Sequence, residues 1–194
     1  MIYLDYSAGT PADPAALEAF VRAEKEYPAN PNSSHAAGAA AWERLADVTE
    51  KIAGLLGVEP QEIVYTSGAS EANNLAVKGI ARARRNFGRH VISTALEHPS
   101  VSAPLTWLQE QGYEIDLADI RRDGKIDTGH LEELLREDTV LVAVSAVDSE
   151  LGVVQPVEEI SGIVRRYPNC ALHVDATRRR GRSLFPSTAP IRPA

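Results

Sequence analysis

Residues 139–147 read Thr-Val-Leu-Val-Ala-Val-Ser-Ala-Val, a nearly unbroken apolar and β-branched run that ends at Asp148. A strand without polar alternation is buried on both faces, which is typical of the centre of a parallel sheet. On either side of this run, short segments with strand character alternate with segments that have helical spacing. The alternation predicts an α/β fold in which a mostly parallel sheet is flanked by helices.

The other strands and helices are predicted from periodicity and turn residues. Short segments with strand character predict strands at residues 62–66, 90–94, 113–117 and 171–175. Apolar spacing between turn signals predicts helices at residues 15–26, 37–56, 70–86, 100–111, 128–136 and 157–167. Gly57 is the expected C-cap of the second helix, and Thr128 is the expected N-cap of the fifth.

The composition is that of a globular protein. Of the 194 residues, 44% are hydrophobic and 24% are charged, which suits one domain and excludes disordered and low-complexity classes. No apolar run approaches the roughly 20 residues of a membrane helix, and the N-terminus lacks the pattern of a signal peptide. Cys170 is the single cysteine and can form no internal disulfide. We therefore expect a reduced, cytoplasmic protein without a membrane segment or a metal site.

The charge of the chain is unevenly distributed. The formal net charge is −7, which argues against nucleic acid as the main partner. Residues 178–194 nevertheless contain five arginines, three prolines and no acid. We interpret residues 1–177 as one structural part and residues 178–194 as a separate Arg- and Pro-rich tail. Binding of nucleic acid by this tail is a weaker alternative, because a lone basic tail on an acidic body is usually solvated.

The residues that follow each predicted strand are the candidates for chemistry, since ligands of parallel sheets bind beyond the carboxyl ends of the strands. After residues 62–66, a small turn leads through Gly68, Ala69 and Ser70 into a helix. The N–H groups and the positive dipole end of that helix suit a phosphate group. The alternative is that Ser67 or Ser70 only caps the helix.

Three further strand ends carry polar side chains. His98 follows the second strand and could stack on a planar ligand or move a proton, or be a partly exposed loop histidine. Ser149 follows the run 139–147 and could bond to a ligand or belong to a simple turn. Asp175 ends the last strand, where its carboxylate could pair with a protonated ring nitrogen or cap a helix. Together these residues describe a site for a planar, phosphorylated ligand that contains a ring nitrogen.

An ordered series of motifs from residue 2 to residue 177 resembles the class V aminotransferase family of pyridoxal-phosphate enzymes and, within it, the cysteine desulfurases. The motifs are Ile2-Tyr3-Leu4-Asp5-Tyr6-Ser7-Ala8, Asn30-Pro31 with Ser33-Ser34-His35, the stretch 66–79, Glu97-His98, Glu150-x-Gly152-x-x-Gln155-Pro156 and His173-Val174-Asp175-Ala176-Thr177. The resemblance implies the large domain of a fold-type I pyridoxal-phosphate enzyme. It also implies a truncated fold, which lacks the last strands and the small C-terminal domain.

The resemblance assigns roles to particular residues. Ala69 and Ser70 would hold the phosphate of pyridoxal 5'-phosphate. His98 would stack on the pyridine ring and take part in catalysis, and Asp175 would bond to the ring nitrogen. Two departures are Ser149, which replaces an asparagine that contacts cofactor and substrate, and Arg178, which replaces a glutamine that faces the phenolic oxygen of the cofactor. The implied reaction converts L-cysteine to L-alanine and passes sulfur on as a persulfide, for iron–sulfur clusters or thiolated nucleotides.

Several groups that the resemblance calls for have no counterpart. The four lysines all precede Asp175, whereas the Schiff-base lysine of the family follows it, and the acceptor cysteine and substrate-binding arginine are also absent. We therefore expect this chain to be inactive by itself and to act in a homodimer or with a complementary chain. A non-catalytic remnant, an interaction module, a transaminase and a selenocysteine lyase remain alternatives. The strand 62–66 would also lack its partners, and the resulting open sheet edge would favour association.

Overall fold

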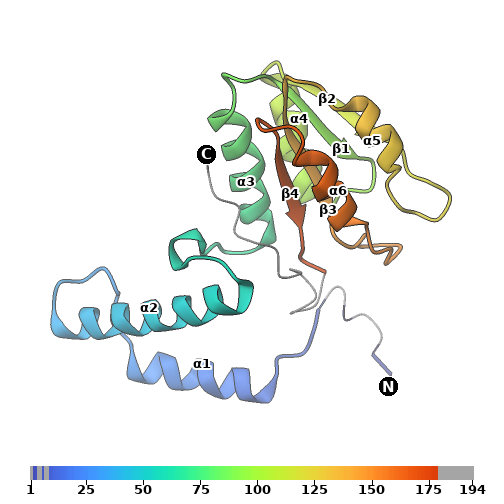
Figure 1. Cartoon of the computed structure of the whole chain (residues 1–194). Helices are drawn as coiled ribbons and strands as arrows, with labels where there is room; N and C mark the ends of the chain where they lie inside the picture. The colour runs from blue at the N-terminus through green and yellow to red at the C-terminus, as the bar shows by residue number, and fades with distance from the viewer. Residues whose placement is uncertain (1, 4–5, 7–8, 179–194) are drawn as a thin grey trace. The chain divides into compact units, whose positions relative to one another are not determined.

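A computed structural model of the chain describes residues 2–3, 6 and 9–178 (Figure 1). These residues fall into a first unit that ends at Tyr65 and a second unit that begins at Thr66. Apart from Arg178, the predicted Arg- and Pro-rich tail lies outside the described residues. No helix in the described part of the chain is long and apolar enough to cross a membrane.

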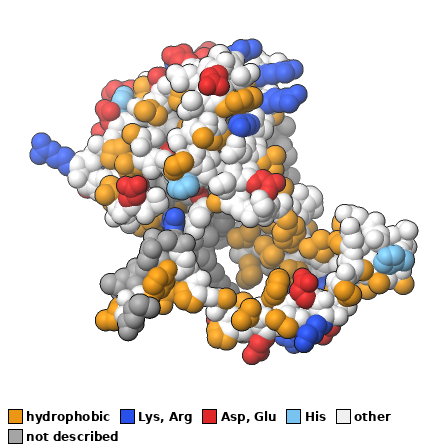
Figure 2. Space-filling model, turned by 180° about the vertical axis from the view of Figure 1, so that it is seen from behind, with side chains coloured by type: hydrophobic (Ala, Val, Ile, Leu, Met, Phe, Trp, Pro, Cys, Tyr) orange, Lys and Arg blue, Asp and Glu red, His pale blue; other side chains and the backbone are white. Residues whose placement is uncertain are grey.

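The first unit is helical. It contains α1 (Pro14–Glu26), α2 (Ala36–Leu56) and the short 3-10 helix η1 (Pro60–Glu62). Gly57 ends α2 with a φ of 71°, a left-handed conformation that favours glycine, so the predicted C-cap is confirmed. Hydrophobic side chains remain exposed on both long helices: Leu17, Phe20, Val21 and Trp42. Figure 2 shows hydrophobic side chains at the surface of the chain.

The second unit contains the sheet. Its strands are β1 (His90–Thr94), β2 (Glu114–Ala118), β3 (Thr139–Ser145) and β4 (Ala171–Asp175). They pair in the order β2-β1-β3-β4, and every pair is parallel. All seven residues of β3 are buried, as the apolar run predicts, whereas the edge strand β4 is half-buried along its length.

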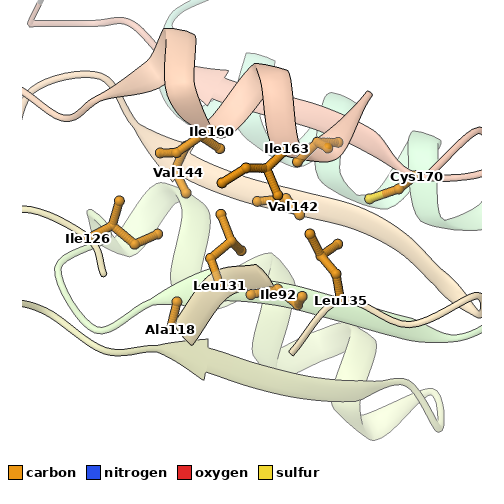
Figure 3. Close-up of a cluster of buried hydrophobic side chains, with 11 residues drawn as sticks. Ile92, Ala118, Ile126, Leu131, Leu135, Val142, Val144, Ile160, Ile163 and Cys170 are labelled. Atoms are coloured by element: carbon orange, nitrogen blue, oxygen red, sulfur yellow. The ribbon is translucent and has the colours of Figure 1, made fainter. Parts of the chain in front are cut away.

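Helices cover both faces of this sheet (Figure 1). Alternate residues of a strand point to opposite faces, so neighbouring residues of β3 pack against different helices. On one face, Leu141 of β3 packs with residues of α3 (Ala69–Ala83) and α4 (Pro99–Glu110). On the other face, Val142 packs with residues of α5 (Thr128–Leu134) and α6 (Val157–Val164). Figure 3 shows the second cluster, in which α5 and α6 meet the sheet. The predicted α/β fold with a parallel sheet and flanking helices is thus confirmed.

Two local predictions are wrong. Residues 62–66 do not form a strand: Glu62 ends η1, and the extended residues after it pair with no strand of the described part. An extended segment becomes a strand only when a neighbour accepts its backbone hydrogen bonds, and Val64 is instead 66% exposed. The N-cap of α5 is Asp127 and not Thr128, because the Asp127 carboxylate accepts hydrogen bonds from the first N–H groups of the helix.

Candidate functional site

A cleft lies at the carboxyl ends of β3 and β4, beside the first turns of α3 and α4. All six residues that the sequence singles out line this cleft: Ala69, Ser70, His98, Ser149, Asp175 and Arg178. Four further residues complete its lining: Ser100, Ser145, Val147 and Thr177. The fold therefore brings together side chains from four separate turns of the chain, as expected for a site at the carboxyl edge of a parallel sheet.

The N-terminus of α3 forms one wall of the cleft. Gly68 is its N-cap, and no side chain caps this end of the helix. Ser67 instead donates from its N–H and its hydroxyl to the Glu71 carboxylate, at 2.7 and 2.6 Å. The alternative of a capping serine is therefore wrong. An uncapped 15-residue helix presents backbone N–H groups and a positive dipole end beside Ala69 and Ser70, which is a suitable place for an anion.

His98 occupies the N-cap of α4. Its Nδ1 accepts a hydrogen bond from the Ser100 N–H at 3.1 Å and lies 2.9 Å from the Ser100 hydroxyl oxygen. The ring is exposed in the cleft, but it is not a free loop side chain because these contacts anchor one of its edges to the helix. Such a ring can offer its face or its second nitrogen to a ligand.

Asp175 ends β4 with both carboxylate oxygens engaged. Oδ1 accepts hydrogen bonds from the N–H (3.0 Å) and the hydroxyl of Thr177, and Oδ2 accepts from Nδ2 of Asn73 at 2.9 Å. Burial by itself would raise the pKa of Asp175, but the hydrogen bonds from Thr177 and Asn73 outweigh burial and hold the pKa below its ordinary value. The carboxylate is therefore ionised at neutral pH and can keep a proton on a ring nitrogen beside it.

One residue behind the cleft, Asn73, is not among the predicted site residues. Asn73, only 4% exposed, donates from Nδ2 to the Ser100 hydroxyl oxygen at 2.9 Å as well as to Asp175. Its Oδ1 lies 3.0 Å from Nε2 of His173. One signal was available in the sequence: Asn73 shares the buried face of α3 with Val77, four residues later. A polar residue in an apolar helix stripe needs buried partners.

Glu97, next to His98 in the chain, ties β1 to β3. Its Oε1 accepts hydrogen bonds from the Thr94 hydroxyl at 2.7 Å and from the Ser145 N–H at 3.1 Å. Its Oε2 accepts from the Ser145 hydroxyl at 2.6 Å. Burial raises the pKa of Glu97 above its ordinary value, although these hydrogen bonds oppose the rise. Glu97 thus aligns the ends of the two strands from which the cleft opens.

Two further predicted residues reach the cleft on turns. The Asp148 carboxylate accepts hydrogen bonds from the N–H groups of Glu150 (3.0 Å) and Leu151, which shapes the turn that carries Ser149. The Ser149 position is therefore both part of a turn and part of the cleft wall. Arg178 adds a positively charged side chain to the same cleft.

The remaining reactive groups of the second unit lie elsewhere. Burial raises the pKa of the Cys170 thiol to about 12, in agreement with the predicted core thiol. The Nζ of Lys78 lies 5.0 Å from the ring centre of Trp107, so this lysine is held on α3 by a cation–π contact. Within the described residues, no group of three or more His, Cys, Asp or Glu side chains could hold a metal ion.

The fold is similar to that of solved structures of NifS-like proteins. A structure entitled "NIFS-LIKE PROTEIN" matches with a TM-score of 0.84 and 34% identity, over 88% of this chain and 47% of that one. A structure entitled "SspA in complex with cysteine" matches with a TM-score of 0.82 and 35% identity, over 90% of this chain and 50% of that one.

The sequence comparisons identify the family. The model of the family "Aminotransferase class-V" matches residues 2–182, and the chain belongs to this family. It is 40% identical to cysteine desulfurase IscS 1 of Archaeoglobus fulgidus over 177 residues, which are 91% of this chain and 46% of that protein. A NifS/IcsS protein homolog of Lactobacillus delbrueckii subsp. bulgaricus is 38% identical over 95% of this chain and 48% of its own length. The chain spans about half the length of the curated relatives it matches.

Proposed function

We propose that this chain is the cofactor-binding half of a pyridoxal 5'-phosphate-dependent cysteine desulfurase. The assembled enzyme would release sulfur from L-cysteine as a persulfide for iron–sulfur cluster assembly or thiolation, and leave L-alanine. The observation that carries the proposal is the single cleft in which an uncapped helix N-terminus, an exposed imidazole and an ionised carboxylate come together. The similarity to cysteine desulfurases supports this substrate over that of another class V activity.

The residues of the cleft fit the chemical groups of this cofactor. The N–H groups at Ala69 and Ser70 suit its phosphate, and the exposed His98 ring suits stacking on its pyridine ring. Asp175 is ionised and would accept a hydrogen bond from the protonated ring nitrogen. Ser149 and Arg178 would contact the remaining polar edge of the ring. When bound, the cofactor supplies an electron-withdrawing ring that weakens bonds at the α-carbon of an amino acid.

The chain would bind this cofactor without a covalent bond. All four lysines precede Asp175, and the two in the second unit are engaged outside the cleft or lie in a turn: Lys78 and Lys125. The anchoring lysine, the persulfide-forming cysteine and the arginine for the substrate carboxylate would come from outside these 194 residues, for example from a complementary chain. A single unpaired thiol is usual in the cytoplasm, where we propose that the protein acts.

A cofactor titration of the purified chain tests this function. We expect a saturable change in the absorbance of pyridoxal 5'-phosphate, and no single-site adduct in the intact mass after borohydride reduction. Asp175→Asn removes a charge-assisted hydrogen bond worth about 1.5–3 kcal/mol and should weaken binding about 10- to 100-fold. Ser102→Ala, which changes an exposed serine of α4, is the matched control and should bind as the unaltered chain does.

The possible results separate the alternatives. Absence of saturable binding would favour the non-catalytic remnant or interaction module and would reject the proposed function. A reduced adduct at one lysine would reject noncovalent binding. If Asp175→Asn and Ser102→Ala bound equally well, the assignment of Asp175 to the ring nitrogen would be wrong.

A further inference from the structure

A continuous series of side-chain hydrogen bonds joins Asp175 to His98 behind the cleft. The bonds run from Asp175 Oδ2 to Asn73 Nδ2, from Asn73 Nδ2 to Ser100 Oγ, and from Ser100 Oγ to His98 Nδ1, each at 2.9 Å. The four residues come from β4, α3 and the start of α4. Two residues that both line the cleft are thus connected through Asn73, which is buried.

The direction of the first link follows from chemistry. An ionised carboxylate can only accept, so the Asn73 amide must turn its NH₂ group toward Asp175. The same NH₂ group reaches the Ser100 hydroxyl oxygen with its second proton. The amide oxygen of Asn73 then faces His173, whose Nε2 lies 3.0 Å away and acts as the donor. All three polar contacts of Asn73 are satisfied in this one orientation.

The direction of the next link follows in turn. Because the Ser100 oxygen accepts from Asn73, its own proton is available for His98 Nδ1. The backbone N–H of Ser100 also points at that nitrogen, at 3.1 Å, and a backbone N–H can only donate. His98 Nδ1 therefore carries a lone pair, and in the neutral ring the proton resides on Nε2.

We propose that Asn73 is a positioning residue that, through Ser100, transmits the hydrogen-bonding state of Asp175 to the imidazole of His98. The consequence is a ring whose Nδ1 is occupied by α4 and whose Nε2–H is the donor available to a ligand. A fixed donor at this position can hold or give a proton at a reacting atom in the cleft. The value of this arrangement for catalysis rests on the proposed function, whereas the arrangement itself can be measured without cofactor.

Nitrogen-15 NMR of the imidazole rings in the full chain, without cofactor, tests the proposal. A pH series gives the spectrum of the neutral ring, in which the two nitrogens are distinguishable. The His98 signals are those that disappear in His98→Gln. We expect an unprotonated Nδ1 and a protonated Nε2. Ser100→Ala removes the hydroxyl that donates to Nδ1, and Asn73→Ala frees that hydroxyl to turn away. Both variants should therefore move the Nδ1 resonance downfield.

Matched variants separate this coupling from a general structural effect. Asn74→Ala changes the neighbouring, half-buried asparagine, whose Nδ2 donates to the Ser70 carbonyl within α3, and should leave the His98 resonances in place. As a single variant, Asp175→Asn should move the Nδ1 resonance of His98. The same change in a Ser100→Ala background should leave that resonance in place. If Asn73→Ala does not fold, the comparison of Asp175→Asn with and without Ser100→Ala tests the proposal.

Three results would overturn the proposal. They are a protonated Nδ1 in the unaltered chain, a Ser100→Ala spectrum equal to that of Asn74→Ala, and an Asp175→Asn effect that persists without the Ser100 hydroxyl. None of these measurements involves pyridoxal 5'-phosphate. Failure of the proposed coupling between Asp175 and His98 is therefore distinguishable from failure of the proposed cofactor binding.

Discussion

Glu97 permits a quantitative prediction about stability, because three hydrogen bonds hold its carboxylate where burial makes the charge costly. Glu97→Ala would leave the Thr94 hydroxyl and the Ser145 hydroxyl and N–H without their acceptor. Each such bond to a charged group is worth about 1.5–3 kcal/mol. Water in the small pocket that adjoins Glu97 can replace part of them, so we expect a loss of about 3 kcal/mol.

Glu97→Gln should behave differently. The amide oxygen can still accept from Thr94 and from the Ser145 N–H, and the Ser145 hydroxyl can rotate to accept from the new NH₂ group. Because no partner is lost and no buried charge remains, the free energy of unfolding at neutral pH should stay within about 1 kcal/mol of the unaltered chain or exceed it.

The sign of the pH dependence follows from the raised pKa of Glu97 in the folded chain. The folded chain binds this proton more tightly than the unfolded chain does. The free energy of unfolding therefore falls as pH rises from the unfolded pKa, about 4.3, to the higher folded pKa. Glu97→Gln lacks this fall, so its stability relative to the unaltered chain should increase across that window and level off above it.

Urea denaturation between about pH 4 and pH 8 measures both effects. A Trp42→Phe background leaves Trp107 as the fluorescent reporter of the unit that contains Glu97. With a slope of about 1.5 kcal/mol per molar urea, Glu97→Ala should lower the midpoint by about 2 M. Glu133→Gln, at an exposed position of α5, controls for the loss of one negative charge. The reasoning fails if Glu97→Gln is as unstable as Glu97→Ala, or if its relative stability does not change with pH.

Three further predictions use the packing of the second unit. Cys170, whose pKa burial raises to about 12, should react with a chromogenic disulfide reagent at about pH 8 only after unfolding in urea, and prompt reaction in buffer would contradict its burial. Gly124→Ala should cost about 1–3 kcal/mol in thermal melts, since Gly124 has a φ of 80° and a Cβ would lie 2.9 Å from Val153. Gly162→Ala, where a Cβ meets nothing within 4 Å, should instead add up to about 1 kcal/mol, and equal shifts in the two melts would refute this contrast. Leu131→Ala, at a fully buried position of α5, should cost about 2–5 kcal/mol in urea, and a loss below about 1 kcal/mol would mean that α5 packs loosely.

The sheet was predictable wherever local sequence and long-range pairing agree. The bounds of β1 and β4 coincide with the predicted runs 90–94 and 171–175, and both segments have a parallel strand beside them to pair with. The segment 62–66 has similar residues but forms no strand, since no strand in the described part of the chain lies beside it to accept its hydrogen bonds. Periodicity reports which side chains can be buried, but it contains no information on whether a partner is present.

The cleft residues that follow β1, β3 and β4 were predictable for a topological reason: parallel strands bring their carboxyl ends to one edge of the sheet, so the residues after them meet. Ala69 and Ser70 instead reach the cleft at the start of α3, because no strand among the described residues precedes them. The residues that organise the cleft from behind were not predictable, because their contacts span long separations, such as the 102 positions between Asn73 and Asp175. Asn73 and Asn74 are chemically identical neighbours. Only the roughly 100° of helical rotation between them makes one buried and the other half-buried.

That rotation is itself encoded in the sequence, which suggests how such residues can be found. The buried stripe of α3 contains Val77 and Ala81, and extending it back by one four-residue step reaches Asn73 and not Asn74. An amide in an apolar stripe costs free energy unless fixed partners satisfy it, so a polar residue in that position implies a buried network. Because the stripe begins next to the turn that we propose binds the phosphate, a network in that position lies against the same cleft. The side chains that orient a site can therefore be inferred from the spacing of buried residues along a helix. The residues that follow strands reveal only the side chains that line the site.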